Sequence, residues 1–188
     1  MHFKKNNLIS IFLPLRKGSK RVKNKNLKPL PNFKQGLTEL KIKQLRKFKN
    51  IFLKDFKKKS IEFIISTNCN KIVEYTGKFK WLKVYKRKES LANDDSLDKL
   101  IQHVPDICSG KYILWTHVTS PNFNELDYIN FIKSFLKKKN KRSKSAFSAE
   151  KIKKFIFSKK KGWVSHNYNE KKWPRTQDLN ELYLANSA

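Results

Sequence analysis

The 188-residue chain is poor in several residue types, and each shortage excludes a class of protein. It has two cysteines, Cys69 and Cys108, too few for a disulfide framework and without metal-ligand spacing. We therefore expect reduced thiols and a cytoplasmic protein. The apolar runs are shorter than the ~20 residues that a membrane span needs. The apolar stretch after Met1 ends at Pro14 without a small-residue cleavage site, so we expect no signal peptide and no membrane partner.

Acidic residues are also few, because 15 Asp and Glu stand against 44 Lys and Arg for a formal net charge of +29. Such a charge can indicate a nucleic-acid partner. However, only six of the basic residues are arginine, the better ligand for phosphate groups and base edges. The lysines are spread along the whole chain. We interpret their charge mainly as a background that attracts anionic ligands, with nucleic-acid binding as the alternative.

The most informative segment is the apolar run Leu8–Leu15 followed by Arg16–Asn26, which reads Arg-Lys-Gly-Ser-Lys-Arg-Val-Lys-Asn-Lys-Asn. The run is short, rich in large and β-branched residues and bounded by polar residues, which predicts a central parallel strand buried on both faces. The basic segment follows where this strand would end, and open α/β sheets bind ligands outside the carboxyl ends of their strands. Backbone N–H groups and cations in such a loop can bind a polyphosphate.

Two common phosphate-binding patterns are missing from this loop, because it has neither the Gly-x4-Gly-Lys-Ser/Thr spacing nor three clustered glycines. It does fit Arg-x-Gly-Ser-Lys-x4-Lys-Asn, at Arg16, Gly18, Ser19, Lys20, Lys25 and Asn26. In this motif the chain resembles the CMP-sialic acid (acylneuraminate) synthetases, the cytidylyltransferases that activate sialic and related nonulosonic acids. A solvated basic loop is the alternative, and the combination of strand, Gly-Ser turn and terminal Lys-Asn favours the motif.

Apolar periodicity predicts that helices and strands alternate after this loop. The predicted order is helix 38–52 capped by Thr38, strand 61–68, helix 70–77, strand 81–85, a helix through 97–104, a strand from 111 and helix 123–136. Right-handed β-α-β crossovers make such a sheet parallel. We expect one α/β domain over residues 1–188, a Rossmann-like nucleotidyltransferase three-layer sandwich with a mostly parallel central sheet.

Three later segments also resemble the family. Arg87–Ser96 is similar to its Arg-Pro-x-x-Leu-Ala-x-Asp segment, with Lys88 in place of proline, although Asp94 or Asp95 could simply cap the next helix. His117–Pro121 is similar to its Gln-Pro-Thr-Ser-Pro, and the departure at His117 leaves the identity of the acceptor open. Trp173–Leu179 is similar to its Arg-x-Gln-x-Leu segment.

The resemblance implies a role for each matching residue. The nucleotide would be bound by Leu15, Arg16, Gly18, Ser19, Lys20, Lys25, Asn26, Arg87 and Ser96, with Arg16 and Lys25 acting in catalysis by neutralising the triphosphate. The acceptor would be bound by His117, Thr119, Ser120, Arg175 and Gln177. A guanidinium binds a carboxylate at two points, which suits Arg175. A structural hydrogen-bonding role is an equal alternative for His117.

The implied reaction is transfer of CMP from CTP to an acidic 2-keto sugar, with Mg²⁺ as cofactor, pyrophosphate as leaving group and a homodimer as the assembly. The family's Asp-x-Asp metal motif does not occur in the chain, so the metal ligands are unknown and we expect the C-terminal part of the family fold to be missing. Residues 145–149 are predicted as the next strand. Residues 150–175, with a hairpin around 159–162, are predicted as a dimerisation or acceptor-side extension.

Three alternatives remain open at this point. The first is a cytidylyltransferase of the kind that activates 3-deoxy-octulosonate, and the second is a family member that binds nucleotide without turnover. The third, from another class, is a basic nucleic-acid-binding protein, which would need arginine and aromatic side chains gathered on one face.

Overall fold

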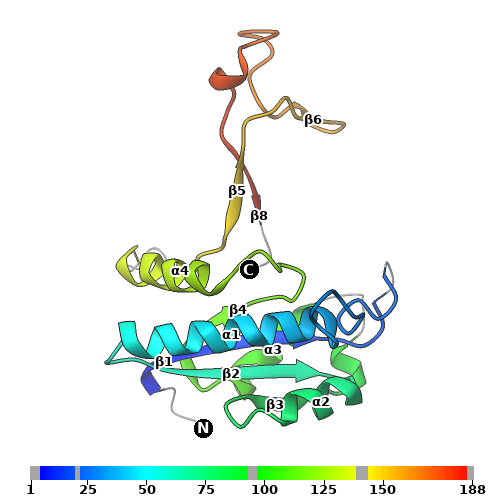
Figure 1. The fold of residues 1–188 in the computed structure, drawn as a ribbon. Coiled ribbons are helices and arrows are strands. Elements are labelled where there is room, and N and C mark those ends of the chain that lie inside the picture. The colour runs from blue at the N-terminus through cyan, green and yellow to red at the C-terminus, as the bar shows by residue number, and fades with distance from the viewer. Residues whose placement is uncertain (1–4, 20–21, 93–96, 139–143, 186–188) are drawn as a thin grey trace.

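The computed structural model describes residues 5–19, 22–92, 97–138 and 144–185. A body built on a four-stranded sheet carries a long arm that projects from it beyond helix α4 (Figure 1). Within the described ranges, the helices lack the combination of length and apolar character that a membrane span requires.

The central sheet is parallel throughout and has the strand order β3-β2-β1-β4. Its strands are β1 (Lys5–Leu15), β2 (Ser60–Thr67), β3 (Lys83–Lys86) and β4 (Gly110–Trp115). Strand β1 pairs with β2 from Leu8 to Leu15 and with β4 on its other side. The predicted central strand is therefore confirmed.

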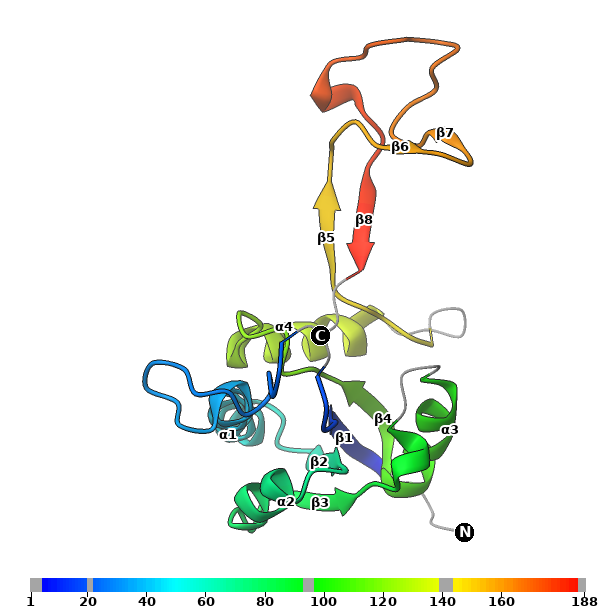
Figure 2. The same ribbon diagram turned by 90° about the vertical axis from the view of Figure 1, so that its right-hand side faces the viewer.

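Helices cover both faces of the sheet, so the body has three layers (Figure 2). Helices α1 (Gly36–Asp55), α2 (Asn70–Gly77) and α4 (Glu125–Lys138) share a core with Ile9, Ile11, Leu13 and Leu15 of β1. Helix α3 (Asp98–Ile107) packs on the other face, against Phe12 and Ile64. Alternate residues of a strand point to opposite faces, and β1 is apolar at both sets of positions. The predicted Rossmann-like α/β fold is confirmed.

Helix α1 begins two residues before the predicted cap, Thr38. Its first residue, Gly36, has a φ of +56°, and a Cβ there would lie 2.1 Å from the carbonyl oxygen of Lys28. Only glycine fits this left-handed, crowded position. The cap prediction for Thr38 is wrong, because its hydroxyl donates instead to the carbonyl of Asn26 at 2.7 Å. Asp94 and Asp95, the predicted caps of α3, lie outside the described residues.

The arm is a two-stranded antiparallel ribbon of β5 (Ala149–Ile152) and β8 (Leu182–Ala185). Beyond it lies a hairpin of β6 (Phe157–Ser158) and β7 (Gly162–Trp163), which confirms the predicted hairpin. The strand predicted at 145–149 is wrong, since the strand begins at Ala149 and pairs with β8 rather than with the central sheet. Phe147 is the large apolar side chain of that segment and is 69% exposed, so the segment has no apolar face to bury against the sheet.

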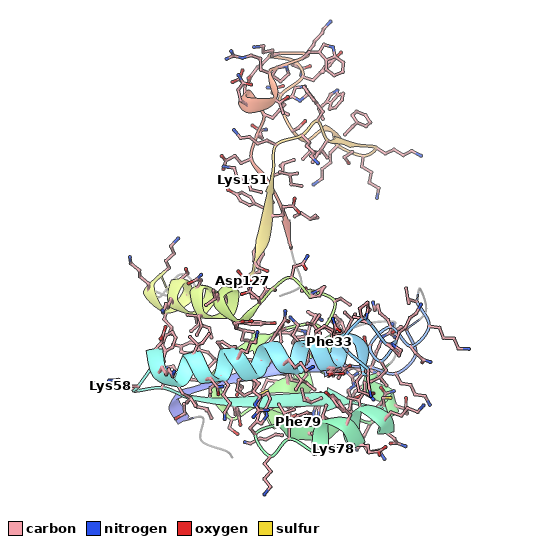
Figure 3. The ribbon with its side chains drawn as sticks, viewed as in Figure 1. Phe33, Lys58, Lys78, Phe79, Asp127 and Lys151 are labelled. Carbon is pink, nitrogen blue, oxygen red and sulfur yellow. The ribbon has the colours of Figure 1, made fainter. Side chains whose placement is uncertain are left out.

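Exposed lysines lie on every part of the molecule. Lys58 precedes β2, Lys78 follows α2 and Lys151 lies on the arm, and all three are exposed (Figure 3). The positive charge is therefore distributed around the surface and along the arm, as its spread along the sequence predicts.

Candidate functional site

A cavity of about 740 Å³ lies where β1 and β4 end. Its lining residues are Pro14, Arg16, Ser19, Lys25, Asn26, Arg87, Leu97, Leu100, Trp115, His117, Val118 and Thr119. The next strand after β1 along the chain, β2, pairs with one edge of β1, whereas β4 pairs with its other edge. This is a topological switch point, the place where open α/β sheets bind ligands.

One wall of the cavity is the loop that follows β1. Gly18 turns this loop with a φ of +80°, which glycine adopts without strain. The side-chain amide of Asn26 donates to the carbonyl of Arg16 at 3.0 Å and so ties the two ends of the motif together. Asn68, directly after β2, accepts with its side chain from the backbone N–H of Lys17 at 2.7 Å and donates to Glu89 at 2.8 Å. The Arg-x-Gly-Ser loop is thus held from two sides.

Three cationic side chains, Arg16, Lys25 and Arg87, line the cavity, and none of its described lining residues is acidic. Arg87 follows β3, donates its backbone N–H to the carbonyl of Thr67 at 2.7 Å and is only 5% exposed. Burial lowers the pKa of Arg87, and the positive charge of Arg16 lowers it further. The Nε of Arg87 is buried and has no hydrogen-bond partner among the described residues. An unpaired buried donor is unfavourable.

Several other lining residues are aromatic or apolar. Trp115, the last residue of β4, packs edge-on against Phe12 with 4.8 Å between ring centroids. The ring of His117 lies 6.1 Å from that of Trp115, and burial lowers the pKa of His117. A neutral imidazole keeps one nitrogen that can accept a hydrogen bond. Leu97 and Leu100 add to this apolar part of the lining, and together with the cations it is a combination that can bind a ligand with both a phosphate end and a flat ring.

The structure brings seven of the predicted site residues to this one cavity. They are Arg16, Ser19, Lys25, Asn26, Arg87, His117 and Thr119. Gly18 lines a small depression of about 30 Å³ together with Arg16 and Ser19.

Other predicted site residues lie elsewhere in the structure. The side chain of Leu15 is buried in the core under α1 and does not line the cavity. Ser120 is not among the lining residues, although its carbonyl is held by α1. Lys20 and Ser96 lie outside the described residues.

Arg175 and Gln177 are on the arm, not at the cavity. Arg175 directly precedes the short helical turn Thr176–Asp178 and Gln177 lies within it; this is the orange-red turn at the far end of the arm (Figure 1). Arg175 donates its Nε to Asp178 at 3.0 Å and its side chain is 72% exposed, while the carbonyl of Gln177 accepts from Lys153 at 2.8 Å. Within one chain, the structure does not bring these residues to the cavity.

Sequence reasoning missed several cavity residues, namely Pro14, Leu97, Leu100, Trp115 and Val118. A signal was present for two of them, because Pro14 and Trp115 stand at the ends of predicted neighbouring strands. Asn68 was also missed as a support of the Arg-x-Gly-Ser loop, since only its place after a strand was visible.

The described residues do not form a protein-held magnesium site. They contain no group of three or more His, Cys, Asp and Glu side chains that could hold a metal ion. The lining side chains that carry oxygen are the hydroxyls of Ser19 and Thr119 and the amide of Asn26. Because Mg²⁺ prefers carboxylates together with water and phosphate oxygens, this donor set does not fit. Mg²⁺ stays a prediction.

Comparison of the chain with protein-family models found no match, and comparison with curated proteins also found none. The resemblance to cytidylyltransferases therefore depends on the sequence motifs alone.

Proposed function

We propose that the chain is a cytidylyltransferase that binds CTP in this cavity and transfers CMP to a nonulosonic, sialic-type acid in the cytoplasm. The observation that supports this proposal most strongly is the set of three cations, Arg16, Lys25 and Arg87, around a cavity at a topological switch point. None of the described lining residues is acidic, so an anionic ligand would meet no negative side chain there. The aromatic lining residues Trp115 and His117 offer a surface for a base or a sugar ring.

The reaction needs positioning and charge neutralisation more than covalent chemistry from the protein. The anomeric hydroxyl oxygen of the acceptor forms a bond to the α-phosphorus, and the bond from that phosphorus to the bridging oxygen breaks. Pyrophosphate leaves, and the hydroxyl proton passes to solvent. Arg16 and Lys25 neutralise charge on the triphosphate and on the leaving pyrophosphate. Neutral His117 can accept a hydrogen bond from an acceptor hydroxyl.

Calorimetric titration with CTP tests the binding part of this proposal. Arg16→Ala and Lys25→Ala should each lower CTP affinity by about tenfold or more, because each removes a charge-assisted hydrogen-bond donor. Arg46→Ala is the matched control, since Arg46 is an exposed arginine on α1 away from the cavity. Wild-type affinity in both cavity variants would contradict the assignment of the loop.

We also propose a homodimer in which the arm of one copy reaches the cavity of the other. An isolated two-stranded ribbon is only marginally stable in water. The arm also carries exposed aromatic side chains, with Phe157 63% and Trp173 66% exposed, of the kind enriched at protein interfaces. A partner's arm would place Arg175 and Gln177 beside an acceptor, which a single chain does not do.

A further inference from the structure

Helix α1 contacts both walls of the cavity through one row of side chains. Thr38 accounts for the first contact, because its hydroxyl and its backbone N–H both donate to the carbonyl of Asn26, at 2.7 and 3.0 Å. Lys41 and Gln44 follow at three-residue spacing, so they lie on the same face of the helix. They contact the other wall, through the β4–α4 loop (residues 116–124).

Lys41 is completely buried, with 0% of its surface exposed. Its Nζ donates to the carbonyls of Ser120 and Phe123 at 2.9 and 3.1 Å, and to the hydroxyl of Tyr128 at 3.1 Å. An ammonium group has three donors, so each one has an acceptor here. All three acceptors are uncharged. The buried ammonium group therefore holds two loop carbonyls and one phenol hydroxyl in place.

The same row fixes the rest of the β4–α4 loop. The side chain of Gln44 donates to the carbonyl of Pro121 at 2.7 Å. Tyr128 hydrogen-bonds to the hydroxyl of Thr116 at 2.6 Å, and Thr116 immediately precedes His117. Loop carbonyls that face a protein interior need such partners, because an unpaired buried acceptor is unfavourable.

We propose that Lys41 is a positioning residue that holds the β4–α4 loop, and with it His117 and Thr119. It thereby keeps these two residues at the distance from the Arg-x-Gly-Ser loop (the phosphate loop) that the acceptor requires. The identity of that acceptor depends on the proposed function, whereas the positioning of the loop does not. Because Thr38 holds the phosphate loop from the same helix face, α1 sets the separation of the two walls. Lys41 does not line the cavity, so it acts on the ligand only through the loop.

Hydrogen–deuterium exchange of Lys41→Met tests this proposal without any ligand. The backbone N–H groups of Thr116, Ser120 and Phe123 are hydrogen-bonded, so their exchange reports opening of the loop. We expect exchange about tenfold faster or more in peptides from this loop, and unchanged exchange in β1 and β2. Lys43→Met is the matched control, because Lys43 is exposed on the same helix and pairs with Glu39. Unchanged loop exchange, or equal acceleration throughout the body, would overturn the proposal.

Tyr128→Phe is a second variant in case Lys41→Met does not fold. It removes only the hydroxyl between Lys41 and Thr116 and should accelerate exchange in the same loop to a smaller extent. In the enzyme assay, Lys41→Met should raise the KM for the acceptor about tenfold while CTP affinity changes less than about twofold. Equal losses for both ligands would contradict a positioning role. If wild-type protein does not bind CTP, the proposed function fails while the exchange experiment still decides the role of Lys41.

Discussion

Arg87 and Lys41 are both buried cations, but their side-chain hydrogen bonds differ. All three Nζ donors of Lys41 have protein acceptors, whereas the Nε of Arg87 has none among the described residues and the side chain lines a cavity. Sequence could place Arg87 in a motif. It could not single out Lys41 among 44 basic residues, because a lysine on the apolar face of a helix looks like any interruption of the pattern.

The titration of Lys41 gives a prediction for stability against pH. Burial lowers the pKa of Lys41 from 10.5 to about 8, and the negative charge of Asp127 acts in the opposite direction. The unfolded chain therefore binds more protons than the folded protein between about pH 8 and 10.5, and this residue makes the free energy of unfolding rise with pH. The gain between pH 8 and 10 is about 2 kcal/mol.

Urea denaturation of wild type and Lys41→Met at pH 8 and pH 10 measures this gain. From pH 8 to pH 10 the free energy of unfolding of the wild type should rise by about 2 kcal/mol relative to that of Lys41→Met. The other titrating groups are the same in both proteins, so their contributions cancel in the comparison. A difference that stays constant with pH would show that Lys41 titrates as an ordinary exposed lysine.

Among the helices and strands, the sequence correctly predicted those whose structure is decided by burial alone. Strands β1 and β2 are short apolar runs buried in the sheet, and the predicted helix 70–77 coincides with α2. Residues 145–149 failed because a short segment with one large apolar residue carries too little pattern to choose its pairing partner. The convergence of the loops after β1, β3 and β4 on one cavity could be predicted from strand order. The projection of the arm away from the body could not be predicted, because it depends on which strand β5 pairs with.

Complementation between two inactive variants tests the role of the arm. Arg16→Ala damages the cavity and Arg175→Ala damages the arm, so each should abolish or strongly reduce turnover when it is present in both copies. In a mixed dimer, one cavity has both an intact loop and an intact partner arm. When equal amounts of the two variants are mixed and their subunits exchange, about half of the dimers are mixed. Because one of the two cavities in each mixed dimer is functional, about a quarter of wild-type activity should be restored. Retained activity in Arg175→Ala, or no recovery on mixing, would contradict the proposed exchange of arms.

For the molecule as a whole, the charge of +29 and the cavity point to the same kind of ligand. Lysines on the body and the arm give a field that attracts anions and weakens as salt is added. Such a field attracts nucleotides and acidic sugars as well as nucleic acid, so charge alone cannot separate the two classes of function. The proposed nucleotide site is supported instead by the cavity, whose three cations follow parallel strands of the sheet.

The most direct test is pyrophosphate release from CTP in the presence of Mg²⁺ and a panel of acids: sialic, pseudaminic and legionaminic acids and 3-deoxy-octulosonate. We expect release with a nonulosonic acid and a large loss of that release in Arg16→Ala. Release with the octulosonate alone would change the acceptor class. Absence of both release and CTP binding, together with salt-dependent binding of random-sequence DNA, would contradict a cytidylyltransferase function.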